Sequence, residues 1–318
     1  MRVETSQGPA DLLDDPGRPG AQVLYLDGLA SSHVDLRDPQ RLHMDYQWRL
    51  GAALDALRPA RGEPLDVVHL GGGALALPRF VAATRPRARQ AVWEIEPELV
   101  ALGRRRLGGR KLGLRCGDAA ELMARHRRAD VVIGDAFVGT ALPPQLATPA
   151  FAAQVRRVLA PAGLYLLNVV DAPPWEDADA QERILRETFA HVLAFGAREV
   201  VTRRRAGNAL FAASDAPLGR AALARALSGG AFPGLVREPR SRRLADLADR
   251  APQSHAADAP DAARAVDAAE ARHAGDAAEV GQPQQDRGAA DDRGRADDAG
   301  ARRHSGAADH AGGRSDPR

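Results

Sequence analysis

Glycines and carboxylates follow four short apolar runs of this sequence, and these residue types could together bind a nucleoside. They are Gly71, Gly72 and Gly73 after residues 65–70, Glu94 within 89–96, Gly117, Asp118 and Ala119 after 112–116, and Asp135 within 129–137. Glycines permit a tight turn and let a ligand lie on bare backbone at the start of a helix. A carboxylate about 20 residues later suits ribose hydroxyls. We expect the loop around Asp118 to meet the edge of a nucleobase.

The charge of this set indicates what kind of nucleoside it would hold. Glu94, Asp118 and Asp135 are acidic, and carboxylates in a partly desolvated cleft attract a cation. S-adenosylmethionine and its decarboxylated form carry such a cation, a sulfonium. Residues 71–76 also fit the relaxed dinucleotide pattern, in which a helix N-terminus meets a pyrophosphate. Asp118 and Asp135 would repel a pyrophosphate, so the sequence favours a sulfonium nucleoside over a dinucleotide.

The elements that position these residues follow from the spacing of apolar side chains. Runs typical of buried strands alternate with segments of helical periodicity, which predicts a mostly parallel sheet covered on both faces. The predicted strands lie at 65–70, 89–96, 112–116, 129–137 and 164–170, and the predicted helices at 76–85, 97–107, 119–127, 148–163 and 179–195. Ligands bind such a sheet beyond the carboxyl ends of its strands. The four groups of residues above occupy that edge.

The two ends of the ordered part are predicted to be antiparallel. Residues 21–36 hold two alternating apolar runs around Asp27 and Gly28, a pair that suits a tight hairpin. A helix is expected over 44–57. Residues 197–205 and 208–214 are predicted to form a second hairpin at one edge of the sheet.

Several motifs together resemble the spermidine synthase family, the polyamine aminopropyltransferases. They are LYLDG in the hairpin, MDYQ soon after it, HLGGGALALPR, VWEIEPELV, CGDA, VVIGDAF and FAAQVRRVLAPAGLYLLNVV. The resemblance spans roughly residues 22 to 235. It implies an α/β, Rossmann-like class I S-adenosylmethionine-dependent methyltransferase fold with a small N-terminal β-hairpin element; the composition adds a disordered C-terminal tail. It also implies a role in polyamine biosynthesis. Family members transfer an aminopropyl group from decarboxylated S-adenosylmethionine to an amine and release methylthioadenosine.

The resemblance assigns roles to individual residues. It implies that Glu94 binds the ribose hydroxyls and that Asp118 and Ala119 bind the adenine. Tyr46 matches a tyrosine beside the amine substrate, and Asp135 matches the carboxylate that accepts a proton. An ammonium must lose a proton before its lone pair can attack the carbon next to sulfur, so the chemistry requires such a base.

Three acidic positions of the family pattern carry apolar residues in this chain. Ala74 stands in the glycine turn, Val138 after the fourth strand and Trp48 after the tyrosine motif. Each replaces a carboxylate that would hold an ammonium of the donor or of the polyamine. Three interpretations remain open: an aminopropyltransferase-like enzyme with an altered acceptor, a methyltransferase that uses intact S-adenosylmethionine, and a non-catalytic nucleoside-binding protein.

The composition divides the chain into four parts. We expect a disordered N-terminus over 1–20, a hairpin and linking helix over 21–60, a Rossmann-like nucleoside-binding catalytic domain over 61–236 and a low-complexity tail over 237–318. In the tail, Ala, Gly, Asp and Arg dominate and large apolar residues are rare, so we expect disorder. A solvated tail, a frameshifted translation of a GC-rich gene and an interaction segment all fit this composition.

The remaining sequence features indicate a cytoplasmic protein. No stretch approaches the roughly 18 to 20 apolar residues of a membrane span, and the N-terminus lacks the apolar core of a signal peptide. The single cysteine, Cys116, and the absence of a Cys/His cluster argue against disulfides and metal sites. A formal net charge of +2 gives no reason to expect nucleic acid as a partner. We expect a small-molecule amine substrate, no tightly bound cofactor, and the homodimer that the resemblance implies.

Overall fold

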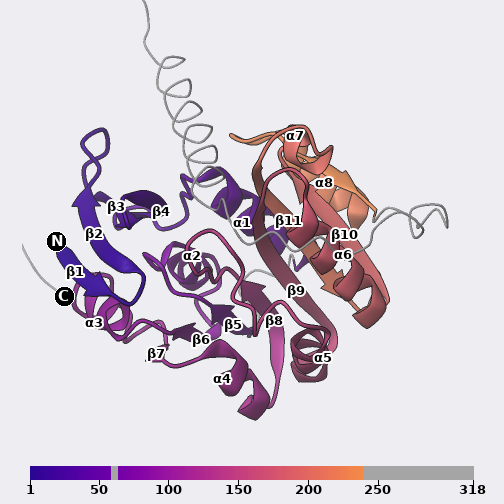
Figure 1. Cartoon of the computed structure of the whole chain (residues 1–318), viewed down its shortest axis with the longest axis horizontal. Coiled ribbons are helices and arrows are strands. Elements are labelled where there is room, and N and C mark those ends of the chain that lie inside the picture. Colours follow the sequence, from indigo (N-terminus) through magenta and orange to yellow (C-terminus); the bar gives the residue numbers. More distant parts are fainter. Residues whose placement is uncertain (59–63, 239–318) are drawn as a thin grey trace, which may run out of the picture. The chain divides into compact units, whose positions relative to one another are not determined.

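The computed structural model describes residues 1–58 and 64–238 of the chain. Its central sheet is built from β5 (Asp66–Leu70), β6 (Arg89–Glu94), β7 (Leu114–Cys116), β8 (Ala129–Gly134), β9 (Leu159–Asp171), β10 (His191–Gly196), β11 (Gly207–Ser214) and β12 (Leu235–Arg237). The strand order is β12-β10-β11-β9-β8-β5-β6-β7 (Figure 1). Strands β5 to β9 are parallel, and β10 to β12 continue the sheet antiparallel. This confirms the predicted α/β, Rossmann-like fold.

Helices cover both faces of the sheet. They are α1 (Asp45–Leu57), α2 (Ala76–Thr84), α3 (Pro97–Arg106), α4 (Ala119–Arg125), α5 (Pro149–Val158), α6 (Glu176–Thr188), α7 (Arg198–Val201) and α8 (Arg220–Ser228). Successive strand residues point to opposite faces, so Val67 packs in the core under α1, α2 and α8. Its neighbour Val68 packs in the core under α4, α5 and α6. Because both faces are buried, the strands read as nearly continuous apolar runs.

A separate antiparallel sheet is formed by the N-terminal residues. It consists of β1 (Arg2–Thr5), β2 (Gly8–Asp14), β3 (Ala21–Leu26) and β4 (Leu29–Asp35), paired in chain order. The expected hairpin is confirmed between β3 and β4, where Asp27 and Gly28 have positive φ angles of 47° and 80°. The expectation of disorder over residues 1–20 is wrong. Ala10 and Leu12 alternate along β2 and are buried, which anchors that strand.

The predicted hairpin at the C-terminal edge is also corrected. Residues 197–205 form α7 and a turn rather than a strand. The strand that pairs with β11 is β10, and five of its six residues fall in the segment predicted as a helix over 179–195. β11 is an inner strand, because β9 pairs with its other side. Phe195 of β10 has no exposed surface. Burial of the apolar side chains of β10 favours this strand as the partner of β11.

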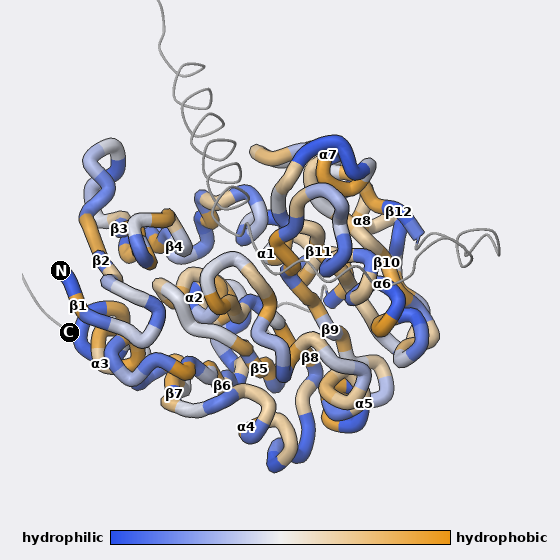
Figure 2. The backbone as a smooth tube through the Cα atoms, in the orientation of Figure 1, coloured by the Kyte–Doolittle hydropathy of each residue, from blue (hydrophilic) through white to orange (hydrophobic). Residues whose placement is uncertain are grey.

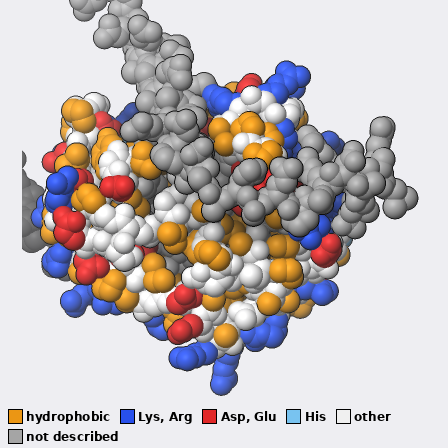
Figure 3. Space-filling model, viewed as in Figure 1, with side chains coloured by type: hydrophobic (Ala, Val, Ile, Leu, Met, Phe, Trp, Pro, Cys, Tyr) orange, Lys and Arg blue, Asp and Glu red, His pale blue; other side chains and the backbone are white. Residues whose placement is uncertain are grey.

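The described residues divide clearly by hydropathy. Figure 2 shows hydrophobic stretches around β5 and β8 and hydrophilic stretches in outer loops. On the face drawn in Figure 3, hydrophobic, acidic and basic side chains are interspersed. Among the described residues, no helix is long and apolar enough to cross a membrane. The expected tail over 237–318 lies outside the described residues, apart from its first two positions.

Candidate functional site

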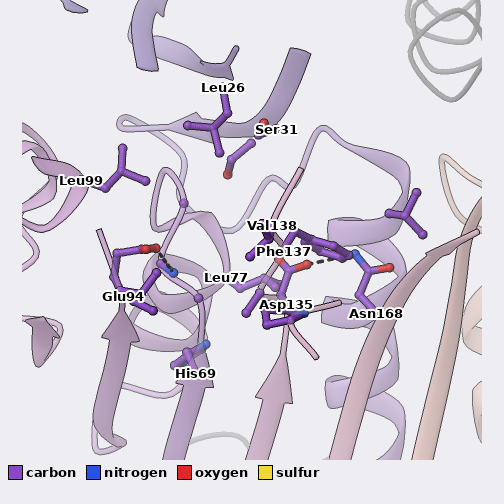
Figure 4. A pocket seen from close by; sticks show the side chains of 18 of the residues that line it. Leu26, Ser31, His69, Leu77, Glu94, Leu99, Asp135, Phe137, Val138 and Asn168 are labelled. Carbon is purple, nitrogen blue, oxygen red and sulfur yellow. Dashed lines mark hydrogen bonds between the residues drawn. The ribbon is translucent and has the colours of Figure 1, made fainter. Parts of the chain in front are cut away.

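A pocket of about 260 Å³ lies at the carboxyl ends of β5, β6 and β8. The strand order reverses between β5 and β8, with β6 on the other side of β5. This is the point at which open α/β sheets bind ligands. The end of the β3–β4 hairpin closes the pocket from the opposite side, where Figure 4 shows Leu26 and Ser31 above the strand ends. The central sheet and the N-terminal sheet therefore both line the site.

The three consecutive glycines form the turn from β5 into α2, and all three line the pocket. Gly71 has a φ of 91°, and a Cβ there would overlap the backbone oxygen of Asp135. Gly73 has a φ of 46° and lies against Ser32. Glycine is therefore required at position 71 by the close approach of the protein's own backbone, before any ligand is considered. The same turn leaves the Gly72 N–H facing the end of β6.

Ala74, which stands where the family pattern has a carboxylate, faces the protein core. It has no exposed surface and packs in the cluster under α1 and α2. It is not among the residues that line the pocket. Trp48 is likewise turned away from the pocket and packs against Phe232, with ring centroids 6.1 Å apart. Of the three replaced positions, Val138 alone lines the pocket.

Glu94 ends β6 and is buried at one side of the pocket. Its Oε2 accepts a hydrogen bond from the Gly72 N–H at 2.9 Å, and its Oε1 accepts one from the Glu96 N–H at 3.1 Å. Burial raises the pKa of this carboxyl, although hydrogen bonds from the backbone of Glu96, Gly72 and Gly73 oppose the rise. The carboxylate is thus fixed in orientation beside the glycine turn.

Asp118 occupies a different place from the one predicted. Its carboxylate caps the N-terminus of α4, accepting a hydrogen bond from Ala120 N–H at 2.6 Å. The second oxygen accepts one from Gln145 Nε2 at 3.0 Å. Ala119 lines the pocket, whereas Asp118 does not. The structure therefore brings the backbone of this loop to the site and gives the Asp118 side chain a capping role.

Asp135 follows β8 and lies across the pocket from Glu94 (Figure 4). Asn168 of β9 donates a hydrogen bond from Nδ2 to Asp135 Oδ1 at 2.9 Å. Burial raises the pKa of Asp135 to about 6, against the opposing effect of hydrogen bonds from Asn168 and Tyr46. A carboxylate with a pKa near 6 is a stronger base than an ordinary aspartate and is still largely ionised at neutral pH.

Tyr46 lies in the first turn of α1 and also lines the pocket. Its hydroxyl is 3.1 Å from the Ser31 backbone oxygen, to which it can donate a hydrogen bond, and 3.3 Å from Gln47 Nε2. The structure thus brings Tyr46 to the same side of the pocket as Asp135. Asp118 is the one predicted binding side chain that is not brought there.

Asn168 and Gln7 are among the pocket residues that the sequence did not predict. Asn168 is the one polar residue in the apolar run of β9, and that interruption was the signal. Gln7 lies in the segment expected to be disordered, so nothing in the sequence indicated it. Its Oε1 accepts a hydrogen bond from Gly139 N–H at 2.8 Å, and its Nε2 donates to Phe137 O at 3.4 Å.

The charged groups among the described lining residues are all acidic. They are Asp27, Glu94 and Asp135, and no Lys or Arg joins them. His69 also lines the pocket, but burial lowers its pKa to about 4, so it is neutral at physiological pH. In the described part of the chain, pocket included, no group of three or more His, Cys, Asp or Glu side chains could hold a metal ion. The pocket favours a ligand with positive charge.

Comparison with solved structures identifies proteins of the same fold. No protein-family model matches this chain, and no curated protein matches it by sequence. A probable spermidine synthase from Corynebacterium glutamicum is 27% identical, with a TM-score of 0.70, and the match covers 75% of this chain and 90% of that one. A spermidine synthase in complex with the transition state analogue AdoDATO is 17% identical, with a TM-score of 0.51 over 68% of this chain and 73% of that one. Spermidine synthase from Thermotoga maritima is 18% identical, with a TM-score of 0.50 over 68% and 72%.

The fold and the strand-end pocket define a Rossmann-like protein of the class I methyltransferase type. Within that class, this chain has a spermidine synthase-like fold, and its low identity to the solved structures is consistent with a divergent member. The resemblance that the motifs indicate is confirmed. These relatives support a transferase of the aminopropyltransferase or S-adenosylmethionine-dependent kind.

Proposed function

We propose that this protein is a spermidine synthase-like transferase that binds decarboxylated S-adenosylmethionine and transfers its aminopropyl group to a small-molecule amine. The observation that carries the proposal is the pair of acidic side chains on opposite sides of one pocket. Glu94 is held by backbone N–H groups beside the glycine turn, and Asp135 is held by Asn168. The first suits the nucleoside, and the second suits the amine.

The reaction needs a base at the position of Asp135. The acceptor enters as an ammonium, and one of its protons passes to the Asp135 carboxylate. The freed lone pair attacks the methylene carbon next to the sulfonium, so that a C–N bond forms as the C–S bond breaks. The sulfur keeps the bonding electrons and leaves as neutral methylthioadenosine. General base catalysis of this kind contributes about 10²- to 10⁴-fold to a rate.

The glycine turn and the hairpin contribute position rather than chemistry. The Gly71–Gly73 backbone lets the nucleoside lie close to the start of α2. Ser31 and Ser32 of the hairpin line the same space, and their hydroxyls are positioned there by hydrogen bonds to Leu29 O at 3.1 Å and from Gln47 Nε2 at 3.0 Å. Holding donor and acceptor in line converts their encounter into an effectively intramolecular step.

Product analysis tests the proposal directly. The purified protein is incubated with decarboxylated S-adenosylmethionine or with S-adenosylmethionine, each with a mixed pool of amines, and the nucleoside products are identified by mass spectrometry. Methylthioadenosine from the first donor supports the proposal. S-adenosylhomocysteine from the second would instead indicate methyl transfer, and binding of both donors without either product would indicate a non-catalytic nucleoside-binding protein.

Two variants assign the chemistry. Asp135→Asn is expected to reduce methylthioadenosine formation by about 10²-fold or more, with donor binding retained. Asp215→Asn is the matched control, because Asp215 is an exposed carboxylate that pairs with Arg156 and does not line the pocket. Equal rates for Asp135→Asn and the parent protein would exclude Asp135 as the proton acceptor.

A further inference from the structure

In the part of the chain that the structure describes, the acceptor side of the pocket contains a single interior carboxylate. Glu94 is committed to the Gly72 and Glu96 N–H groups at the nucleoside side. Asp27 sits in the exposed turn of the β3–β4 hairpin, at the outer rim. Among the described residues that line the pocket, Asp135 is left as the one interior carboxylate that can meet an ammonium of the acceptor.

The surfaces beside Asp135 are uncharged. Phe137 and Val138 come two and three positions after it in the chain and lie next to it in Figure 4. Val170 and Asn168 of β9 and Asn208 of β11 line the same side. Amides, a phenyl ring and aliphatic side chains can contact methylene groups, but none of them neutralises a second ammonium.

We infer that the acceptor is a monoamine, with one primary amine and an uncharged, largely apolar body, rather than an α,ω-diamine. This inference rests on the proposed function. The single ammonium meets Asp135, and the body contacts the wall of Phe137, Val138 and Val170. A diamine bound in the same way would place its distal ammonium against this wall, where it loses hydration without gaining a counter-ion.

Val138 is the position that sets this preference. Its side chain is 52% exposed at the pocket rim, so a polar group there does not disturb the core. The loop is held by Gln7, through Gly139 N–H and Phe137 O. A carboxylate introduced at this position would therefore stand at a fixed place beside the acceptor body, where it could pair with a distal ammonium.

Two amines of the same length test the inference. Pentylamine and 1,4-diaminobutane differ in one terminal group, a methyl in the first and an ammonium in the second. Calorimetric titration of each into the full-length protein saturated with methylthioadenosine measures acceptor binding without requiring turnover. We expect pentylamine to bind at least tenfold more tightly. Equal or tighter binding of 1,4-diaminobutane, or binding of neither amine, would overturn the inference.

The variants then locate the cause. Val138→Asp should shift the ratio of the two affinities at least tenfold toward 1,4-diaminobutane, whereas Val138→Asn, which has the same shape without the charge, should keep the preference for pentylamine. Asp27→Asn should also keep it. An unchanged ratio in Val138→Asp, or a shift in Asp27→Asn as large as the one expected for Val138→Asp, would contradict the assignment to Val138.

The same samples separate this inference from the proposed function. If pentylamine binds preferentially but no methylthioadenosine forms from decarboxylated S-adenosylmethionine, aminopropyl transfer is wrong and the monoamine site stands. If methylthioadenosine forms faster with 1,4-diaminobutane than with pentylamine, the proposed function stands and the monoamine inference fails.

Discussion

Asp135 shows how the surroundings of one residue set its chemistry. An aspartate in water would be too weak a base to take a proton readily from an ammonium. At the end of β8, burial raises the pKa of the Asp135 carboxyl to about 6, and the hydrogen bond from Asn168 fixes its orientation. The raised pKa and the fixed geometry come from the same position in the fold, because both β8 and β9 end beside it.

The pH dependence of turnover follows from this pKa. Asp135 must be ionised to accept a proton, so the rate of methylthioadenosine formation should fall as the pH drops below about 6. At higher pH the carboxylate is fully ionised and its contribution is constant. Rates measured from pH 5 to 8 at saturating donor check this. A profile that stays flat through this range would show that Asp135 is not the base.

The raised pKa of Asp135 favours turnover at neutral pH but lowers the stability of the folded protein there. A carboxyl whose folded pKa is raised binds its proton more tightly in the folded state, so its contribution to stability is present at low pH and is lost as the pH rises through about 6. Asp135→Asn removes this loss. The free energy of unfolding of the variant minus that of the parent should therefore rise by up to about 3 kcal/mol from pH 4 to pH 7.5. This figure is an upper limit because Asp135 is partly solvated. Urea unfolding at both pH values measures it.

Ala74 departs from the family pattern without changing the pocket. An apolar residue in place of a family carboxylate suggests, from the sequence, a binding site that has lost a charge. In the structure Ala74 has no exposed surface and belongs to the core. Restoring a carboxylate there would bury a charge rather than complete the pocket.

Ala74→Asp is therefore expected to destabilise the protein by at least about 2 kcal/mol, because the new carboxylate would be buried without a partner. The matched control is Ala150→Asp, at an exposed position in the first turn of α5, where an acidic residue is neutral or slightly stabilising. Thermal unfolding compares the two variants. Tighter donor binding with unchanged stability in Ala74→Asp would show that position 74 faces the ligand after all.

Among the elements, the turn between β1 and β2 has a role that its sequence does not announce. Ser6 donates two hydrogen bonds to Glu96, from its N–H at 2.9 Å to Oε2 and from its hydroxyl to Oε1. Gln7 bonds Phe137 and Gly139 on the loop after β8. One short turn therefore ties together two loops that come from different strands of the central sheet and lie on opposite sides of the pocket.

Removal of one of these ties should loosen the loop after β8. Gln7→Ala eliminates both hydrogen bonds to residues 137–139, so hydrogen exchange of that loop should become faster and amine should dissociate more quickly. Gln22→Ala is the control, since Gln22 lies in the same sheet and bonds Asp14, away from the pocket. Exchange in 137–139 that is identical in both variants would show that Gln7 does not hold the loop.

The elements also show which parts of the fold can be predicted from the sequence. The parallel strands were predicted because burial on both faces makes them continuous apolar runs. β10 and α7 were misassigned because the β-branched residues of 197–205 suggest a strand, and the packing of Phe195 against β11 and β12 is a tertiary effect. The strands β1 and β2 were missed because glycine, proline and aspartate dominate the segment that follows them, residues 15–20.

The candidate site also contains residues whose position the sequence predicts and residues whose position it does not. Gly71–Gly73, Glu94 and Asp135 were placed correctly because residues at the carboxyl ends of parallel strands meet at one edge. Asp118 was misplaced, since a sequence cannot show whether a carboxylate after a strand faces a ligand or caps the next helix. The side of the pocket formed by the β3–β4 hairpin depends on how the N-terminal sheet packs on the central one, and no local sequence pattern encodes that packing.

The pocket exists only because the N-terminal sheet and the central sheet meet. The central sheet supplies Glu94 and Asp135, and the N-terminal sheet supplies Ser31 and Ser32. Gly73 lies against Ser32, and Tyr46 of α1 bonds the Ser31 backbone. Ligand held between these surfaces must contact both, so binding and the packing of the two sheets are thermodynamically linked.

Hydrogen exchange with and without saturating methylthioadenosine tests this linkage. Amides at residues 29–32 of β4 and at 71–73 after β5 should both exchange more slowly in the complex, because the ligand is bound between them and restrains both segments. Residues 220–228 of α8 do not line the pocket and serve as the internal reference for local protection. Protection at 71–73 with none at 29–32 would mean that the nucleoside is held by the central sheet alone. In that case the N-terminal sheet would contribute to the amine side of the pocket and not to donor binding.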